Sequence, residues 1–468
     1  MSENYTPEQQ FQPAPPVMEQ PAYDFGAGEP VAAPAPAKKK SPLLKIGIIA
    51  VAAILVIVLA CVLFGGGSED ADYMFDQGLV AVKQNGMWGY VNDDGEMVIS
   101  PIYSSAAPFA ENGLARVSMG FKYGYIDTKG QLALPTIYTS ARSFNEHGLA
   151  AVKMDESGKW GFINEDGEYV VQPIYDEVNS FADNGLCAVG VNMKEKDKEG
   201  IEQTVTKWGY INTKGEQVIP TTYQTAGTFA ENGLAMIQLN DKCGFIDAKG
   251  NVKIQAVYDR ANSFADNGLA AVGVTTKEKL EDTDIEIEVT KWGYINEKGE
   301  QVIQSSYAAA GMFADNGLAL VWTESESKDE NGNVEVKHLA SYINEKGEVK
   351  IQTQYEEAYS FGKNGLAAVK MTGEDGKWGF IDETGSFKIS PQYDEVSFFA
   401  ENDLVAVEMN DKYGFINKKG ETKITPFYDE VSDFYDDGYA AVGVGEKVGI
   451  IDEKGSTVIS PIYDSINP

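Results

Sequence analysis

The chain has 468 residues, with 38 Lys and Arg against 71 Asp and Glu, so its formal net charge is −33. A surface of this sign repels DNA, RNA and anionic lipid, which argues against nucleic acid as a partner and leaves cations and basic partners open. Since 43% of the residues are hydrophobic and 11% are aromatic, the chain has ample apolar material for a folded core.

Residues 1–42 are rich in Pro, Gln, Ala and Glu and contain few aliphatic clusters. Such a segment cannot bury enough apolar surface to offset the entropy that is lost on ordering. We therefore expect a disordered, Pro-rich cytoplasmic tail, which is either an inert solvated segment or a docking segment for a cytoplasmic protein.

Residues 43–64 are predicted to form one transmembrane helix that anchors the chain in a membrane. From Ile46 to Phe64 there are 19 residues without a charge, which would span about 28 Å as a helix, close to the hydrocarbon thickness of a bilayer. Four Lys precede this stretch and acidic residues follow it, so the N-terminus should stay cytoplasmic and the rest should be extracytoplasmic. A cleaved signal peptide, or a lipoprotein modified at Cys61, is the alternative. Residues 65–74, which begin with three Gly, are predicted to be a flexible linker.

Residues 75–468 are predicted to be one domain of ten repeat units, each about 35–49 residues long. A Phe opens each unit and a Tyr closes it, with two Gly turns, a GLAAV-like segment and a KWGFIN-like segment between them. The opening residues are Phe75, Phe109, Phe144, Phe181, Phe229, Phe264, Phe313, Phe361, Phe399 and Phe434. The closing residues are Tyr103, Tyr138, Tyr175, Tyr223, Tyr258, Tyr307, Tyr355, Tyr393, Tyr428 and Tyr463.

The spacing inside these units is more regular than the residues themselves. The Trp slot, which is the position before the Gly of the KWG-like segment, lies 15 positions before the closing Tyr in all ten units, and six positions separate each Tyr from the next Phe. Length varies only between the opening Phe and the Trp slot, from 13 to 28 positions. This pattern predicts stacked units with their insertions on one side. We expect an open β-solenoid or superhelical array, with one or two β-propellers as the alternative, because ten units exceed the roughly four to eight blades typical of propellers.

Each unit is predicted to contain short strands and no helix. In the third unit the predicted strands are residues 149–152, 160–163 and 169–171, which are apolar and rich in aromatic or β-branched side chains. A Gly turn at residues 164–167 separates the last two. No amphipathic helical period of useful length appears, so the fold class is all-β.

The aromatic residue of the Trp slot is interpreted as a packing residue. A buried aromatic ring removes roughly 150–250 Å² from water and holds a short strand against its neighbour. The slot varies to Cys243, Ala340 and Val448, which a catalytic or ligand-stacking role would not tolerate. The Gly that follows is expected to permit close approach of the adjacent repeat or a kink. The predicted structural slots are Trp88, Trp160, Trp208, Trp292, Trp378, Tyr123 and Tyr413.

The recurring segments G-L-A-x-V, K-W-G-F-I-(D/N)-x-x-G and P-x-Y resemble WG repeats, which are related to the KWG repeats of bacteria. The resemblance covers about residues 75–463, or over four-fifths of the chain. It implies a membrane-anchored bacterial member of the family with a β-rich domain that serves as an interaction module, and it brings no catalytic residues. Unit seven departs most, with Leu-Ala-Ser-Tyr at 339–342, and the last unit lacks the aromatic at Val448 and is a candidate cap.

We expect no enzymatic activity and no cofactor. His147 occupies a turn and His338 ends an insertion, and neither recurs with a Cys or Ser partner, so zinc sites and nucleophilic triads have no support. Acidic turns such as 93–95 make calcium the alternative ligand, although other units carry Lys at this position. Cys187 and Cys243 are expected to be buried free thiols, with a disulfide between them as the alternative.

Units four, six and seven extend the same loop with charged residues, which predicts three longer β-hairpins on one edge of the array. Such hairpins are either a partner-binding surface or tolerated surface decoration. The candidate partner-binding residues are Lys194, Glu195, Lys277, Glu278, Trp322, Glu324 and Lys328.

The function expected from the sequence is that of a membrane-anchored, extracytoplasmic scaffold that binds a protein or another envelope component. Three alternatives remain open: a cell-wall or glycan-binding module, a purely structural surface spacer, and a hydrolase built on a propeller. Exposed, aligned aromatic residues would favour the glycan-binding module, and a cluster of converging carboxylates in a central channel would favour the hydrolase.

Overall fold

The computed structural model describes residues 73–155, 158–197, 199–279, 286–328, 334–352, 355–371 and 376–468, except for the side chains between positions 325 and 338. The chain divides into two units, Met1–Ile57 and Val58–Pro468, and the described residues all belong to the second. The predicted tail and transmembrane helix, and residues 65–72 of the predicted linker, lie outside them. Within the described residues no helix has the length and apolarity needed to cross a bilayer.

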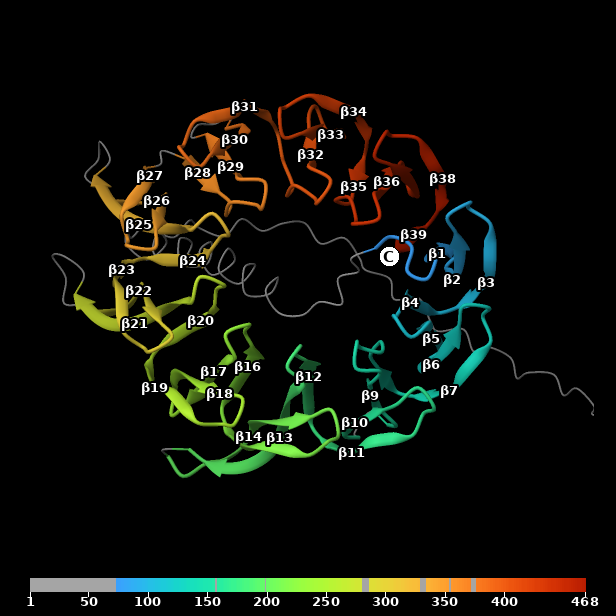
Figure 1. Ribbon diagram of the computed structural model, residues 1–468, viewed down its shortest axis with the longest axis horizontal. Coiled ribbons are helices and arrows are strands. Elements are labelled where there is room, and N and C mark those ends of the chain that lie inside the picture. The colour runs from blue at the N-terminus through green and yellow to red at the C-terminus, as the bar shows by residue number, and fades with distance from the viewer. Residues whose placement is uncertain are drawn as a thin grey trace, which may run out of the picture. The chain divides into compact units, whose positions relative to one another are not determined.

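The repeat domain is a ring of ten small antiparallel β-sheets, a ten-bladed β-propeller (Figure 1). Nine blades have four strands and one has three, and the strands of each blade follow one another from the axis of the ring outward. Blades 1 to 5 are β39 (Ser465–Asn467) with β1 (Leu79–Gln84), β2 (Met87–Asn92) and β3 (Met97–Tyr103); β4 (Ser105–Phe109), β5 (Leu114–Met119), β6 (Lys122–Asp127) and β7 (Leu132–Tyr138); β8 (Ser140–Ala141), β9 (Ala150–Lys153), β10 (Trp160–Ile163) and β11 (Tyr169–Tyr175); β12 (Glu177–Phe181), β13 (Leu186–Lys196), β14 (Glu202–Asn212) and β15 (Gln217–Tyr223); and β16 (Thr225–Phe229), β17 (Leu234–Leu239), β18 (Lys242–Asp247) and β19 (Val252–Tyr258).

Blades 6 to 10 continue around the ring in chain order. They are β20 (Arg260–Phe264), β21 (Leu269–Lys279), β22 (Glu286–Asn296) and β23 (Gln301–Tyr307); β24 (Ala309–Phe313), β25 (Leu318–Lys328), β26 (Val334–Asn344) and β27 (Val349–Gln352); β28 (Tyr355–Ala358), β29 (Leu366–Met371), β30 (Trp378–Asp382) and β31 (Phe387–Tyr393); β32 (Leu404–Glu408), β33 (Tyr413–Asn417) and β34 (Thr422–Tyr428); and β35 (Glu430–Val431), β36 (Tyr439–Val444), β37 (Lys447–Asp452) and β38 (Thr457–Tyr463).

The predicted open solenoid is wrong, and the propeller alternative is confirmed, because the last strand of the chain closes the ring. β39 pairs antiparallel with β1, with Lys83 opposite Ser465 and Ala81 opposite Asn467. In the described part of the chain, the residues after Tyr463 supply the inner strand of blade 1. Each edge that an open array would expose at its ends is thereby paired.

The three predicted strands of the third unit correspond to β9, β10 and β11. Sequence reasoning missed the innermost strand, which in eight blades precedes or contains the opening Phe and in blade 1 is β39; β4, for example, ends at Phe109. In blade 9 this strand is reduced to a single bridge between Val396 and Val407.

The first unit does not open at Phe75 as predicted. Met74 is fully buried among Val80, Val91 and Ile450, where the other units bury their Phe. The carbonyl of Phe75 accepts the N–H of Gly78, as the residue after the opening Phe does in the other blades. Met74 therefore occupies the Phe slot of the first unit.

The hydrophobic core lies between neighbouring blades. The aromatic residue two positions after the Trp slot is buried and contacts the Phe of the next blade; the rings of Tyr90 and Phe109, for example, are 4.9 Å apart. The Tyr90 hydroxyl also donates a 2.7 Å hydrogen bond to the carbonyl of Ala107 in that blade. Burial of each such ring contributes about 1.5–3 kcal/mol to the free energy of folding and stabilises the contact between its blade and the next one.

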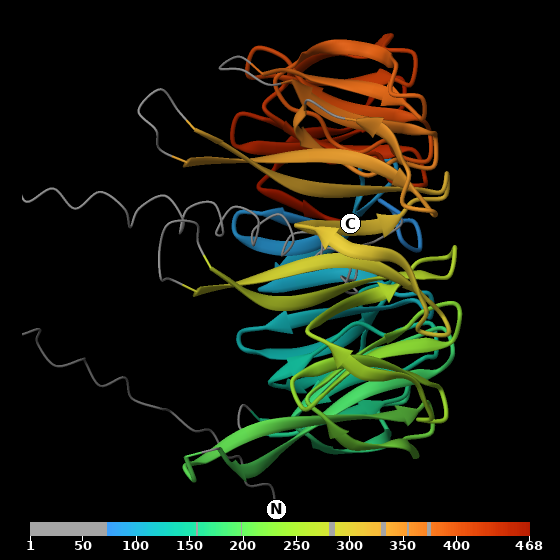
Figure 2. The same cartoon turned by 90° about the vertical axis from the view of Figure 1, so that its left-hand side faces the viewer.

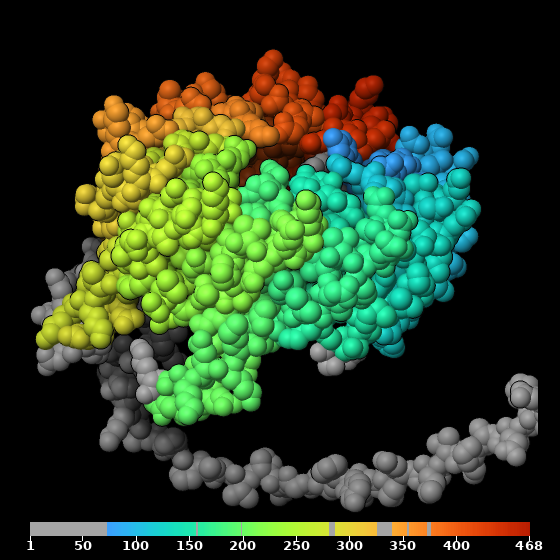
Figure 3. Space-filling view, turned by 60° about the horizontal axis from the view of Figure 1, so that its bottom comes forward, coloured from blue at the N-terminus to red at the C-terminus, as the bar shows by residue number. Residues whose placement is uncertain are grey.

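The insertions all lie on one side of the ring, which we call the hairpin side (Figure 2). They lengthen the connection between the second and third strands of blades 4, 6 and 7, giving the hairpins β13–β14, β21–β22 and β25–β26. The green hairpin of blade 4 projects from the body of the domain in Figure 3.

Candidate functional site

The seven predicted structural slots lie on the third strand of their blades, three or four positions before the strand ends, and six of them pack at the boundary with the next blade. Trp208, for example, is opposite Tyr223 across the ladder and packs against the cluster that joins blades 4 and 5. Trp378 is fully buried and Trp292 nearly so. The other five, which are Trp88, Trp160, Trp208, Tyr123 and Tyr413, are partly buried. The slot rings therefore do not form an exposed, aligned row on the surface.

Cationic side chains cover several of these rings. Lys153 and Arg142 lie over the ring of Trp160, at 4.8 and 5.4 Å from its centroid. Trp378 is contacted by both the Lys370 ammonium, at 5.7 Å from its ring centroid, and the stacked ring of Tyr359, at 4.8 Å. These contacts stabilise the slot rings at the interface.

The Gly after the Trp slot was predicted to permit either close approach of the adjacent repeat or a kink. In the structure it permits a close approach between two strands of the same blade. A Cβ atom at Gly89 would lie 2.3 Å from the carbonyl oxygen of Ile99 and 2.7 Å from the nitrogen of Pro101, both in the outermost strand of the same blade. Any side chain here would force the third and fourth strands apart.

The Lys of the KWG segment belongs to a recurring clamp between blades. It forms an ion pair with an Asp that follows the closing Tyr, in the pairs Lys159–Asp176, Lys242–Asp259, Lys377–Asp394, Lys412–Asp429 and Lys447–Asp464. The same carboxylates accept backbone N–H groups of the next blade, as Asp176 does from Asn192 at 2.7 Å. Sequence reasoning missed this clamp, although the Tyr-Asp dipeptide recurs in the same five units.

The clamp sets the pKa of its carboxylates. Burial alone would raise the pKa of Asp176, but the hydrogen bonds from Asn192 and Lys159 outweigh it and lower the pKa. At Asp394 the hydrogen bond from Lys377 is the main cause of a lowered pKa. The carboxylates are thus held ionised as part of the blade junctions.

The surroundings of Cys187, Cys243 and His147 in the fold indicate structural roles for these side chains. Cys187 and Cys243 are both buried and free. Burial raises the pKa of the Cys187 thiol to about 12, which leaves it protonated and unreactive. His147 lies in a turn, where its Nε2 atom is 3.3 Å from the carbonyl of Ala182 in blade 4. The side chain of His338 lies outside the described residues.

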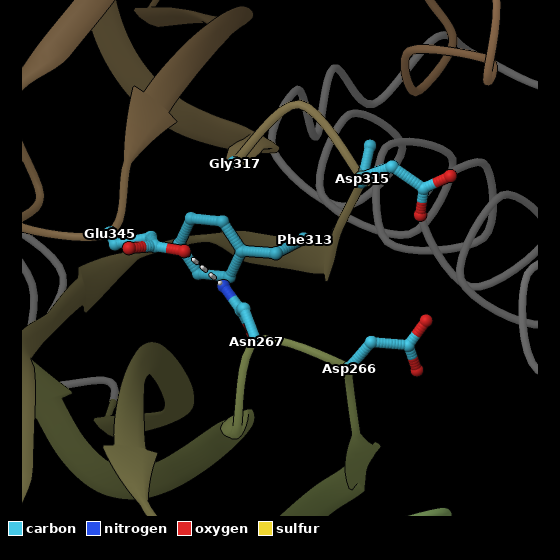
Figure 4. A pocket seen from close by; sticks show the side chains of 7 residues that line it. Asp266, Asn267, Phe313, Asp315, Gly317 and Glu345 are labelled. Atoms are coloured by element: carbon cyan, nitrogen blue, oxygen red, sulfur yellow. Dashed lines mark hydrogen bonds between the residues drawn. The ribbon is translucent and has the colours of Figure 1, made fainter.

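A pocket of about 310 Å³ lies between blades 6 and 7 on the side of the ring opposite the hairpins (Figure 4). It is lined by two turns that follow inner strands, which carry Asp266 and Asp315, and by Glu345. Asn267 donates a 3.1 Å hydrogen bond to Glu345, whereas the carboxylates of Asp266 and Asp315 point away from this pair in Figure 4. Among the described residues, no group of three or more His, Cys, Asp or Glu is placed to hold a metal ion.

The blade 4 hairpin carries the predicted residues Lys194 and Glu195. Lys194 lies 2.7 Å from Glu202 across the hairpin, and Glu195 lies 3.1 Å from Lys207. Both predicted side chains are exposed beyond the body of the blade.

The hairpins of blades 6 and 7 are joined to each other. Lys277 and Glu278 are exposed on β21, and Glu324 of β25 forms a 3.3 Å ion pair with Lys291 of β22. Trp322 is at the base of its hairpin, opposite Ala340, and packs against the core between blades 7 and 8. The side chain of Lys328, the last residue of β25, lies outside the described residues.

Ten segments of the chain match the family model described as "WG containing repeat": residues 88–122, 123–159, 160–194, 208–243, 244–274, 292–321, 341–374, 378–413, 413–447 and 449–468. The chain belongs to the WG-repeat family. A WG repeat is offset from a blade, since the match at residues 123–159 covers the outer strands of blade 2 and the inner strands of blade 3. Each repeat therefore contains the contacts that join two blades.

No curated protein matches the chain. Among solved structures, a eukaryotic initiation factor is similar at a TM-score of 0.49 and 11% identity, over 83% of this chain and 96% of that one. The tricorn protease is similar at a TM-score of 0.31 and 12% identity, over 71% of this chain and 40% of that one.

Proposed function

We propose that this WG-repeat propeller is a non-catalytic scaffold that binds a protein through the hairpin side of its ring, and that residues 43–64 hold it at a membrane with the ring on the extracytoplasmic side. The observation that carries the proposal is the placement of all three long hairpins on one side. A ring used only as a spacer has no need of such projections, because the other seven blades have at most six residues between the second and third strands.

The exposed side chains of the hairpins are suited to protein recognition. The blade 4 hairpin combines the exposed apolar residues Met193 and Ile201, at 39% and 59%, with the charged residues described above. The blade 6 hairpin does the same with Val274 and Ile287, at 37% and 38%. Apolar side chains among charges are typical of protein interfaces with a polar rim.

Trimmed hairpins test the proposal without opening the ring. In blade 5 the two-residue turn Asn240-Asp241 joins the second and third strands, with positive φ at both residues. Replacing residues 192–206, 275–290 and 324–338 by Asn-Asp should give blades 4, 6 and 7 the same turn. The full chain in detergent and its trimmed variant are then compared for binding to untreated and to protein-stripped cell envelopes.

Binding to untreated envelopes only, lost on trimming, is the expected result. Salt-resistant binding to stripped envelopes that survives trimming would support the glycan-binding module. Absence of binding to either material would favour a structural spacer. Protease treatment of intact cells tests the anchoring separately, because the ring should be cleaved from outside if residues 43–64 span the membrane as proposed.

A further inference from the structure

The hairpin side also has a low region, on blades 1 to 3, where the connections between the second and third strands are short and exposed apolar side chains stand among polar ones such as Asn85 and Asp155. We call Met87, Met119, Phe121 and Met154 the methionine floor. Their exposed fractions are 37%, 50%, 94% and 43%, respectively. They lie on or beside the short connections between the second and third strands of three consecutive blades, which are the equivalents of the long hairpins elsewhere; Met87 begins β2 and Met119 ends β5.

Methionine gathers on this side of the ring. Of the ten Met between residues 73 and 468, six lie near the hairpin-side ends of their strands: Met87, Met119, Met154, Met193, Met371 and Met409. Four of these are in blades 1 to 4, so the floor lies on the blades that precede the blade 4 hairpin. Met side chains are flexible and polarisable, which suits a surface that adapts to an apolar partner, and exposed apolar patches on folded domains often mark interaction sites.

The floor is flanked by Lys residues in a strongly acidic protein. Lys122 follows Phe121 and occupies the position of the clamp Lys, but the following blade begins with Thr139 where five junctions have Asp. Among the described residues, Lys122 forms no ion pair, unlike the five clamp Lys. Lys83 and Lys153 lie over the slot rings of blades 1 and 3. A partner that seats here can pair its own carboxylates with these cations.

The opposite side of the ring carries a row of acidic residues. The turn after the inner strand carries an acidic residue in nine blades: Asp76, Glu111, Glu146, Asp183, Glu231, Asp266, Asp315, Glu401 and Asp436. Only blade 8 has a cation there, Lys363. An acidic partner segment is therefore repelled from that side and directed to the floor.

We propose that the methionine floor binds an apolar protein segment flanked by carboxylates, as a second contact for the partner that the hairpins engage. This inference rests on the proposed function. The hairpins also argue against a lipid bilayer as the occupant. β13 extends six residues past Gly190, whereas Phe121 is three residues past the equivalent Ser118. At about 3.3 Å per residue the hairpin of blade 4 reaches roughly 10 Å further, so it would hold a flat bilayer away from Met154 in the adjacent blade.

The test uses the full chain with its hairpins intact. The double variant Met119→Ser/Phe121→Ser removes the most exposed side chains of the floor. Its matched control is Leu132→Ser, because Leu132 is 53% exposed at the start of the outermost strand of blade 2, at the end of that strand away from the hairpin side. We expect the floor variant to bind untreated envelopes about tenfold more weakly, since loss of a buried aromatic anchor commonly has an effect of this size. The control should bind within about twofold of the unaltered chain.

The charge of the partner is tested at Lys122. Lys122→Glu should weaken binding to untreated envelopes, whereas Lys122→Arg should preserve it. Equal binding by Lys122→Glu and Lys122→Arg would overturn the proposed carboxylate contact.

Three outcomes of the floor variant overturn the inference. Undiminished binding, or equal losses in the floor variant and the control, would show that the floor makes no specific contact. Phe121-dependent binding to vesicles of extracted membrane lipid would assign the floor to lipid instead of protein. If trimming the hairpins abolishes binding and the floor variant does not, the proposed function stands and the floor inference fails.

Discussion

The ring depends on four residues at its C-terminus. Deleting Ser465–Pro468 removes β39, and with it the three residue pairs that join β39 to β1. At about 1 kcal/mol per hydrogen bond, the two to four bonds of such a ladder contribute ~2–4 kcal/mol. The half-buried side chain of Ile466 adds ~1 kcal/mol, and Asn467 also donates a 2.9 Å hydrogen bond to Ala106 in blade 2. The sum of ~3–5 kcal/mol corresponds to a roughly 10²- to 10⁴-fold change in the opening equilibrium of blade 1.

Hydrogen exchange of the full chain, followed by peptide mass spectrometry, measures this opening directly. In the truncated chain the amides of β1 should exchange roughly 10²- to 10⁴-fold faster than in the full chain. The exchange rates of the amides of β17, in blade 5, should change little. Deleting Pro468 alone is the matched control, because Pro468 lies beyond β39. In an open array the last four residues would fray without consequence, so a change of less than about threefold in β1 would refute ring closure as the source of its protection.

Three further predictions concern the blade junctions. Gly293→Ala should lower the free energy of unfolding by at least ~2 kcal/mol in a denaturant titration, because its Cβ atom would lie 2.4 Å from the carbonyl oxygen of Ile303; an unchanged midpoint would contradict the close approach. Thr139→Asp should stabilise the chain by about 0.5–1 kcal/mol, since it gives Lys122 the clamp carboxylate that its junction lacks, and a lower thermal midpoint would count against the clamp. The pKa of Asp394 is lowered in the fold, so its contribution to stability is present above the unfolded pKa of about 4 and is lost as the pH falls through the folded value. Asp394→Asn should therefore weaken the loss of stability on acidification, which a titration of the thermal midpoint between about pH 6 and 2 would show.

Much of each blade could be predicted from the sequence because it is encoded locally. The segment 160–163 has the aromatic and branched residues of a strand, and the turn at 164–167 ends in a Gly with a φ of 79°, which few other residues adopt. The constant spacing from Trp slot to Tyr predicted a rigid stretch, which is the pair formed by the third and fourth strands. The family assignment rests on the same local signals and is confirmed by the ten matched segments.

The inner strand was not predicted because contacts with the preceding blade, and not local strand propensity, determine its residue types. β16 reads Thr-Ala-Gly-Thr-Phe, and β24 reads Ala-Ala-Gly-Met-Phe. Both are small-residue segments with weak strand propensity. The carbonyl of the central Gly accepts the buried Tyr hydroxyl of the preceding blade, from Tyr210 and Tyr294, at 2.7 Å in both cases. The need for close approach between blades therefore prevails over local preference.

Ring closure and the methionine floor could not be read from the sequence for a related reason. Closure depends on a contact between residues more than 380 positions apart, such as Lys83 and Ser465, and on the angle between blades, which no single unit specifies. The floor brings together Met87, Met119 and Met154, which are 32 and 35 positions apart. Each of them alone looks like an ordinary strand end, and only the ring places them on one side.

The position of the insertions follows from which connections the ring leaves free. The turn between the third and fourth strands is held against the preceding blade; a Cβ atom at Gly130, for example, would lie 3.1 Å from the side chain of Ile99. The turn after the inner strand is held by contacts such as the bond from Asn267 to Glu345 of the next blade. The connection on the hairpin side between the second and third strands can lengthen beyond its contact with the clamp carboxylate, as in blade 4, where β13 extends past the bond from Asn192 to Asp176. A chain that changes its binding partner but keeps its ring must therefore change this connection. For this reason we expect the hairpins and the floor, and not the repeated Trp-Gly segments, to bind the partner.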